Sequence, residues 1–211
     1  MQEEAQIAVA LLPPRAEEVG TLRRIYEEAL VRFADRGYHG VSVREIAQAC
    51  GIKASSIYAH LPSKERILRD LVLMGHAEHR DRLRDALLGA GSDPTEQLAA
   101  VVAAHVRLHA EYQLLATVAN NELHALSPES RDEAMAVRSE GVRMIVDVIE
   151  RGVRLGRFTC EDPFLAAAAV GAMGIRVAVW YGAENEYRSD AHYSVDEIVN
   201  SYVEFALKLV S

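Results

Sequence analysis

The sequence has little of what sheet-rich, disulfide-bonded or exported proteins need. Only 6% of its residues are aromatic, it holds six prolines, and β-branched runs of strand length are nearly absent, which argues against an all-β fold. Its two cysteines, Cys50 and Cys160, cannot build a framework of several disulfides. Neither belongs to a Cys-x-x-Cys pair, so a structural zinc site loses support as well. A reducing compartment fits best, and we expect a cytoplasmic protein.

Neither an export signal nor a membrane span is predicted. Glu3 and Glu4 precede the short apolar stretch 7–12, where a secretory signal needs positive charge. The longer apolar stretch 163–182 is rich in Ala and Gly and carries one charge, Arg176. An arginine near the middle of a span costs about 2.5 to 3.5 kcal/mol. We therefore expect a buried, closely packing helix there and no contact with a membrane.

Helix-forming patterns fill most of the chain. Half of the residues are apolar and 26% are charged, which is typical of a folded globular protein. Apolar residues recur at helical spacing, and Ser or Asp at several helix starts is followed by Pro in the first turn. The sequence predicts an all-α fold of about nine helices. Their expected positions are 16–36, between Ser42 and Gly51, 54–60, 64–88, 94–111, 113–125, 128–156, 163–182 and 195–210.

We divide the chain into three parts: a flexible N-terminal extension over 1–14, a small helical unit over 15–70, and a larger helical domain over 71–211. Charge separates the last two. Residues 15–70 hold ten Lys/Arg against eight Asp/Glu, whereas 71–211 hold thirteen against twenty-one. Binding to nucleic acid depends on neutralising phosphates, so only the first of these two parts is suited to approach DNA.

Residues 43–60 have the pattern of a helix-turn-helix. Ala47 is small where two helices would cross, and Gly51 occupies the turn. Ile46, Ile52 and Ile57 are the apolar positions that would hold the two helices at a steep angle. An ordinary pair of helices with a polar outer face is the alternative that the motif alone leaves open.

Three stretches of this region resemble the DNA-binding domain of TetR-type transcriptional regulators: 29–38, 43–47 and above all 56–65. The sequence departs from the family pattern at Leu61, where Phe is usual. The resemblance implies a homodimeric helical regulator, most often a repressor released from a palindromic operator by a small-molecule effector. It makes residues 15–70 the expected DNA-binding domain and residues 71–211 the expected ligand-binding and dimerisation domain. A helical enzyme is disfavoured, because no Gly-x-Ser-x-Gly, phosphate loop or His-Glu-x-x-His motif is present. A DNA-binding adaptor without a small-molecule pocket remains an alternative.

The second helix of the motif exposes short or cationic hydrogen-bonding groups, which suit base edges and phosphates in a major groove. The resemblance implies phosphate contacts for Tyr58, His60 and Lys64, and for Ser42 at a helix N-terminus. The expected base-reading residues are Arg44, Lys53, Ser55 and Ser56.

In the predicted ligand-binding domain, His105 and His109 fall on the apolar stripe of helix 94–111, which ends beside Tyr112. Two imidazoles four residues apart could hold a metal, form a satisfied pair in the core, or line a pocket. Val106 stands where the catalytic zinc motif requires Glu, and we predict neither a metal nor a cofactor. His76 and His79, on the preceding helix, are expected to face solvent.

Arg176 is the one charge in its helix, so we expect an anion beside it, either an ion-pair partner or a ligand carboxylate or phosphate. Asn121 and Trp180 complete the expected pocket-lining set, and Asn120 and Glu122 are further candidates. The expected effector is mainly apolar with one anionic group. Small residues over 166–174 and the apolar face of 195–210 predict a dimer interface formed by the last two helices.

Overall fold

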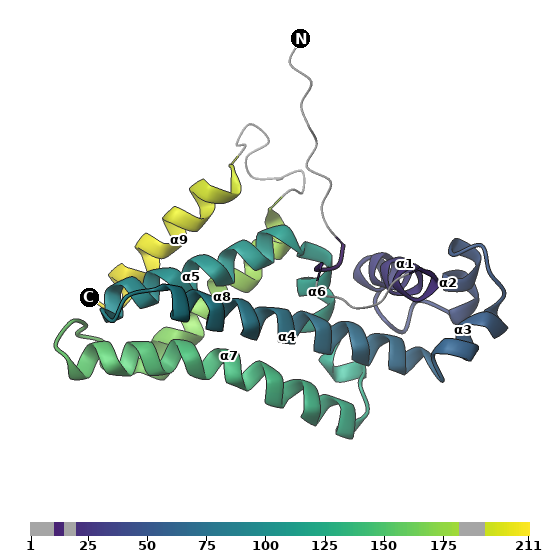
Figure 1. Cartoon of the computed structure of the whole chain (residues 1–211), viewed down its shortest axis with the longest axis horizontal. Helices are drawn as coiled ribbons and strands as arrows, with labels where there is room; N and C mark the ends of the chain where they lie inside the picture. The colour runs from purple at the N-terminus through teal and green to yellow at the C-terminus, as the bar shows by residue number, and fades with distance from the viewer. Residues whose placement is uncertain (1–10, 15–19, 182–192) are drawn as a thin grey trace, which may run out of the picture.

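The computed structural model describes residues 11–14, 20–181 and 193–211, and within these ranges the chain forms helices and no strand (Figure 1). The predicted all-α class is confirmed, and most helix ends lie within two residues of their expected positions. The start of the first predicted helix, before residue 20, lies outside the described residues. The helices are α1 (Thr21–Arg36), α2 (Val43–Ala49), α3 (Ala54–His60), α4 (Lys64–Gly89), α5 (Pro94–Glu111), α6 (Gln113–Asn121), α7 (Pro128–Arg154), α8 (Pro163–Trp180) and α9 (Val195–Leu209), with a 3₁₀ turn η1 (Leu123–Ala125).

Local capping explains where the helices begin and end. At the start of α2 the hydroxyl of Ser42 accepts a hydrogen bond from the backbone N–H of Glu45, whose carboxylate accepts one from the Ser42 backbone N–H. Such a capping box provides hydrogen-bond acceptors for two backbone N–H groups at the helix start that have no partner within the helix. Gly51 ends the same helix with φ of 65°, a left-handed conformation that glycine adopts without steric cost.

Two apolar clusters form the interior. The first contains residues of α1, α2, α3 and α4. Residues of α5 and α6 complete it, among them Leu108 and Leu115. The second fills the space between α5, α7, α8 and α9. Helix α4 runs without interruption across residue 70, so the domain boundary predicted there stays a prediction. Of the predicted N-terminal extension, residues 1–10 lie outside the described part of the chain, and Leu12 is buried in the first cluster.

The helices are arranged around α4, which leads from the small N-terminal helices into the larger half (Figure 1). On the way it packs against α5, α6 and α7. Helix α5 is covered by α9 and α8, and α6 contacts both α1 and α8. The N-terminal unit and the larger half are therefore connected through the continuous α4 and through the contact of α6 with α1.

Helix α8 turns one apolar face outward. Phe164, Leu165 and Val179 are 60%, 63% and 44% exposed, so within a single chain the expected buried helix is buried on its other side only. By length and composition alone, Pro163–Trp180 is apolar enough to cross a membrane, yet only 33% of that window is buried in the chain. The same composition suits a helix that packs against another protein surface.

Candidate functional site

The helix-turn-helix presents most of the predicted DNA-binding residues to solvent. Ile46 and Ile57 are fully buried where α2 and α3 meet, which fixes the outward face of α3. On that face Tyr58 is 53% exposed, unusually high for an aromatic side chain. The exposed members of the predicted set are Ser42, Arg44, Lys53, Ser55, Tyr58 and His60, and Ser56 is half-buried.

Ser42 has a structural task at the start of α2. Its hydroxyl lies 2.7 Å from a carboxylate oxygen of Glu45, whose other oxygen accepts a hydrogen bond of 2.8 Å from Arg36. The hydrogen bonds from Arg36 and then from Ser42 lower the pKa of Glu45 to about 2. A negative carboxylate thus stands beside the predicted phosphate contact of Ser42, which stays a prediction.

Lys64 also has a structural role. Its Nζ donates to the backbone carbonyls of Tyr38 and Val41 at 2.8 and 2.7 Å and lies 4.0 Å from the centre of the Tyr38 ring. Burial lowers the pKa of Lys64. This ammonium joins the start of α4 to the loop before α2, and one of its three N–H groups is left for the predicted phosphate.

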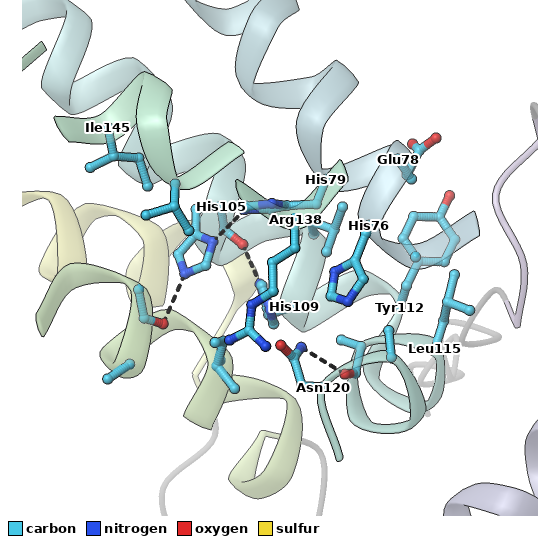
Figure 2. Close-up of a pocket in the computed structure, with 18 of the residues that line it drawn as sticks. His76, Glu78, His79, His105, His109, Tyr112, Leu115, Asn120, Arg138 and Ile145 are labelled. Atoms are coloured by element: carbon cyan, nitrogen blue, oxygen red, sulfur yellow. Dashed lines mark hydrogen bonds between the residues drawn. The ribbon is translucent and has the colours of Figure 1, made fainter. Parts of the chain in front are cut away.

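The larger half of the chain encloses a cavity of about 320 Å³ between α4, α5, α6, α7 and α8. Most of its wall is apolar, which is the usual character of a small-molecule site. Its polar and ionisable lining residues are His76, Glu78, His79, His105, His109, Tyr112, Asn120 and Arg138 (Figure 2).

Hydrogen bonds fix the proton positions in the His79–His105 pair. Nε2 of His105 lies 3.2 Å from the carbonyl oxygen of Gly171, and because a carbonyl only accepts, Nε2 carries the proton. Nδ1 of a neutral His105 is then an acceptor, and Nε2 of His79 donates to it over 2.8 Å. A Cβ at Gly174 would overlap the His105 ring, so the glycine of α8 makes room for this imidazole.

Burial keeps the four histidines neutral at pH 7. It lowers the pKa of His76 and of His109 to about 4 and that of His79 to about 3. The pKa of His105 also falls well below its ordinary value of 6.5 for the same reason. Arg138 lowers the pKa of three of them further, because a guanidinium disfavours a second positive charge nearby.

Arg138 is the one lining residue whose charge is not balanced by a described neighbour. Glu78 accepts a hydrogen bond of 2.8 Å from Arg82, so its carboxylate is paired. None of the described residues forms an ion pair or hydrogen bond with Arg138. Figure 2 shows its side chain reaching into the middle of the lining, close to His109. The cavity thus combines an apolar wall with one free positive charge.

Among the residues that the structure describes, no group of three His, Cys, Asp or Glu side chains has the geometry of a metal site. The histidines face one another through hydrogen bonds instead, with Nε2 of His79 and Nδ1 of His105 only 2.8 Å apart. Those two nitrogens satisfy each other, which leaves the pair without convergent lone pairs for a cation.

Two family models match the chain: "Bacterial regulatory proteins, tetR family" over residues 25–71, and "Tetracyclin repressor-like, C-terminal domain" over 91–210. Together they cover most of its length. The chain belongs to the TetR family.

Similar proteins carry the same assignment. The transcriptional repressor KstR2 of Rhodococcus jostii is 25% identical over 202 residues, which cover 93% of this chain and 96% of the relative. A tetR-family regulatory protein from Rhodococcus has a similar structure, with a TM-score of 0.83 and 29% identity over 92% of this chain and 98% of that one. AibR in complex with isovaleryl coenzyme A and operator DNA shares the fold, with a TM-score of 0.77 and 22% identity over 88% and 97% of the two chains.

The chain is therefore a DNA-binding transcriptional repressor of this family and not an enzyme. TetR-family regulators are soluble proteins that bind operator DNA and small-molecule effectors, typically as dimers. The helix-turn-helix and the cavity described above are the parts of this chain suited to those two tasks.

Three of the predicted ligand-binding residues lie in the cavity and three do not. His105, His109 and Tyr112 line it. Asn121 and Arg176 line a separate open groove between α1, α6 and α8. Trp180 is partly buried against the second apolar cluster, outside the cavity.

The expectation that Arg176 is buried is wrong, because its side chain is exposed on the outward face of α8. A helix that is apolar on every side does not reveal which side faces the core. Asn121 is exposed and Asn120 lines the cavity in its place, since one residue rotates the side chain by about 100° around a helix.

The sequence interpretation missed Arg138 and placed His76 and His79 wrongly. His76 is buried, 5% exposed, and His79 is partly buried, so neither faces solvent. Helical spacing was the available signal. His76 follows buried Val72 by four residues, and Arg138 follows buried Ala134 by four and precedes Gly141 by three, on the inward face of α7.

Proposed function

We propose that the protein binds a palindromic operator in the cytoplasm as a homodimer, with α3 in the major groove. An effector with an apolar body and one anionic group enters the cavity and lowers the affinity for DNA. The observation that carries the effector part is the unpaired charge of Arg138 in a wall that is mostly apolar. A partly buried charge without a partner is costly, and a ligand anion would supply the partner.

For the DNA contacts, we assign Tyr58 and His60 to phosphates and Arg44, Lys53, Ser55 and Ser56 to base edges. The exposed outer face of α3 and the exposed Arg44 on the neighbouring α2 support this assignment. Ser42 and Lys64 remain proposed phosphate contacts. Their hydrogen bonds to Glu45 and to two backbone carbonyls also give them structural roles.

Two helices connect the proposed effector site to the proposed DNA surface. Helix α4 begins at Lys64, next to the helix-turn-helix, and carries His76 and His79 into the cavity. Helix α6 carries Asn120 and packs against α1. A ligand shifts the equilibrium only if it binds one conformation better than the other. We propose that the bound effector favours positions of α4 and α6 that move the two recognition helices of the dimer out of register.

The test uses decanoate as the probe. An operator is first selected from random duplexes with the full-length protein, and decanoate binding is then measured by titration calorimetry. We expect wild type to bind decanoate and to release the operator as decanoate is added. Arg138→Leu should weaken decanoate binding at least tenfold, because a charge-assisted hydrogen bond contributes about 1.5 to 3 kcal/mol.

The matched control is Arg143→Leu on the same helix, where the arginine is 72% exposed and pairs with Asp147. This variant should keep both DNA binding and decanoate binding. Equal decanoate affinity in wild type and Arg138→Leu would refute the proposed role of Arg138.

A further inference from the structure

His76 presents a buried nitrogen that has no hydrogen-bond partner among the described residues. This nitrogen is Nε2, and the residue is only 5% exposed. Interaction with the backbone of Ala119 on α6 raises the pKa of His76, which favours a ring N–H directed toward that carbonyl. A neutral imidazole has one donor and one acceptor nitrogen. Nε2 has no partner, so we assign the proton to Nδ1, and Nε2 then carries a lone pair that can only accept.

His109 is in the same state. Its Nδ1 lies 2.8 Å from the backbone carbonyl oxygen of His105 and must be the donor. Nε2 of His109 is then an acceptor, and no described residue donates to it. The His79–His105 pair differs, since each of the two nitrogens that face each other is satisfied. Nδ1 of His79 is an acceptor as well, but it lies against Gly141 of α7. The acceptors that we consider for a ligand are therefore Nε2 of His76 and Nε2 of His109.

The groups around the cavity do not supply the missing donors. Protonating His76 or His109 would place a second cation beside Arg138, and burial already disfavours it. Asn120 uses one of its two side-chain N–H groups on the backbone carbonyl of Ala116, at 2.8 Å, and forms no described hydrogen bond with either imidazole. A buried acceptor left without a donor costs about 1 to 3 kcal/mol, so an occupant that brings its own donor gains affinity.

We propose that the effector is a hydroxylated apolar acid, whose hydroxyl group donates to Nε2 of His76 or His109 while Arg138 holds the acid group. This inference rests on the proposed function and narrows its ligand class. Arg138 is close enough to both imidazoles to disfavour their protonation, so the hydroxyl belongs near the acid group. A site with buried polar groups binds a ligand that satisfies them much more tightly than an analogue that lacks the matching group.

The experiment compares three acids of equal chain length on the full-length protein: decanoate, 3-hydroxydecanoate and 10-hydroxydecanoate. We expect 3-hydroxydecanoate to bind about tenfold more tightly than decanoate, and 10-hydroxydecanoate to bind no more tightly than decanoate. His76→Phe or His109→Phe should abolish the preference. The control His124→Phe replaces an exposed histidine and should retain it.

A second readout needs no variant. In protein labelled with ¹⁵N-histidine, NMR should show Nε2 of His76 and His109 as unprotonated nitrogens. One of these resonances should move when 3-hydroxydecanoate is added and stay in place with decanoate. If decanoate binds and the 3-hydroxyl adds nothing, or if the 10-hydroxyl is preferred, the inference is wrong and the proposed function stands. If none of the three acids binds, the proposed anionic effector is wrong and the inference fails with it.

Discussion

Tyr58 is a large aromatic side chain on a helix of seven residues, and just over half of it is in solvent. Leaving a ring exposed forgoes the stability that burial would provide, about 1.5 to 3 kcal/mol for a large apolar side chain. Its neighbour Ile57 is the buried anchor of α3, so Tyr58 is free to meet a partner outside the chain. A phenolic O–H at this place suits a phosphate oxygen.

Tyr58→Phe should therefore weaken binding to operator and to random duplexes alike, by about tenfold, because a hydrogen bond to a charged group contributes about 1.5 kcal/mol or more. Fluorescence anisotropy on both duplexes measures the two affinities. Tyr193→Phe is the matched control, since Tyr193 is 45% exposed and lies outside the helix-turn-helix. Unchanged affinity with altered sequence preference would make Tyr58 a base-reading residue.

For single residues, the sequence predicted which way a side chain points from its own helix better than which side chains of other helices it meets. The inward direction of His105 and His109 followed from helical spacing, and it is confirmed. That they share a cavity with Arg138 depends on how α5 and α7 are placed by tertiary packing, which spacing on one helix does not contain. Arg176 was misplaced because a residue's own helix cannot say which of its apolar faces meets the core.

Among the elements, α8 and α9 have more apolar surface than this chain can bury. Phe164 and Leu165 on α8 and Phe205 and Leu209 on α9 are between 44% and 63% exposed. The starts of both helices were predictable, since Asp162 before Pro163 and the Ser194–Glu197 pair are local caps. We propose that a second copy of the chain covers these outward faces in the dimer.

Leu165→Arg combined with Phe205→Arg should convert dimers into monomers at micromolar concentration. In a two-fold interface each change occurs twice, and each buried Leu or Phe contributes about 1.5 to 3 kcal/mol. Sedimentation velocity measures the outcome. Met135→Arg is the control, because Met135 is 39% exposed on α7 and should leave the dimer intact. A double variant that still sediments as a dimer would place the interface on other helices.

For the whole molecule, apolar periodicity and capping residues were enough to predict the helices. The cavity could not be predicted in this way, because it forms only when five helices pack together. It is lined by four imidazoles from α4 and α5 that the fold keeps neutral, of which three are buried and that of His79 is partly buried. The charged and titratable groups that face them are Arg138 from α7, Glu78 from α4 and Tyr112 at the end of α5. The free energy of unfolding should therefore depend on pH.

The stability of the protein should fall as the pH is lowered from 6.5 toward 4. In the unfolded chain a histidine has a pKa of about 6.5 and takes up a proton below that pH. In the fold, burial lowers the pKa of His76 and His109 to about 4, so they remain neutral there. Each such group then removes up to about 1.4 kcal/mol of stability per pH unit in this window. Between pH 6.5 and 5 most carboxylates are still ionised, so this window isolates the histidines.

Urea unfolding at fixed protein concentration, repeated from pH 8 to pH 5, measures this dependence. Wild type should show a level free energy of unfolding above pH 7 and a decline below 6.5. His76→Gln should reduce the slope, because it removes one group that is neutral only in the folded state. His39→Gln, which replaces an exposed histidine, should leave the slope unchanged. A slope that is the same in wild type and His76→Gln would mean that burial of His76 does not suppress its protonation.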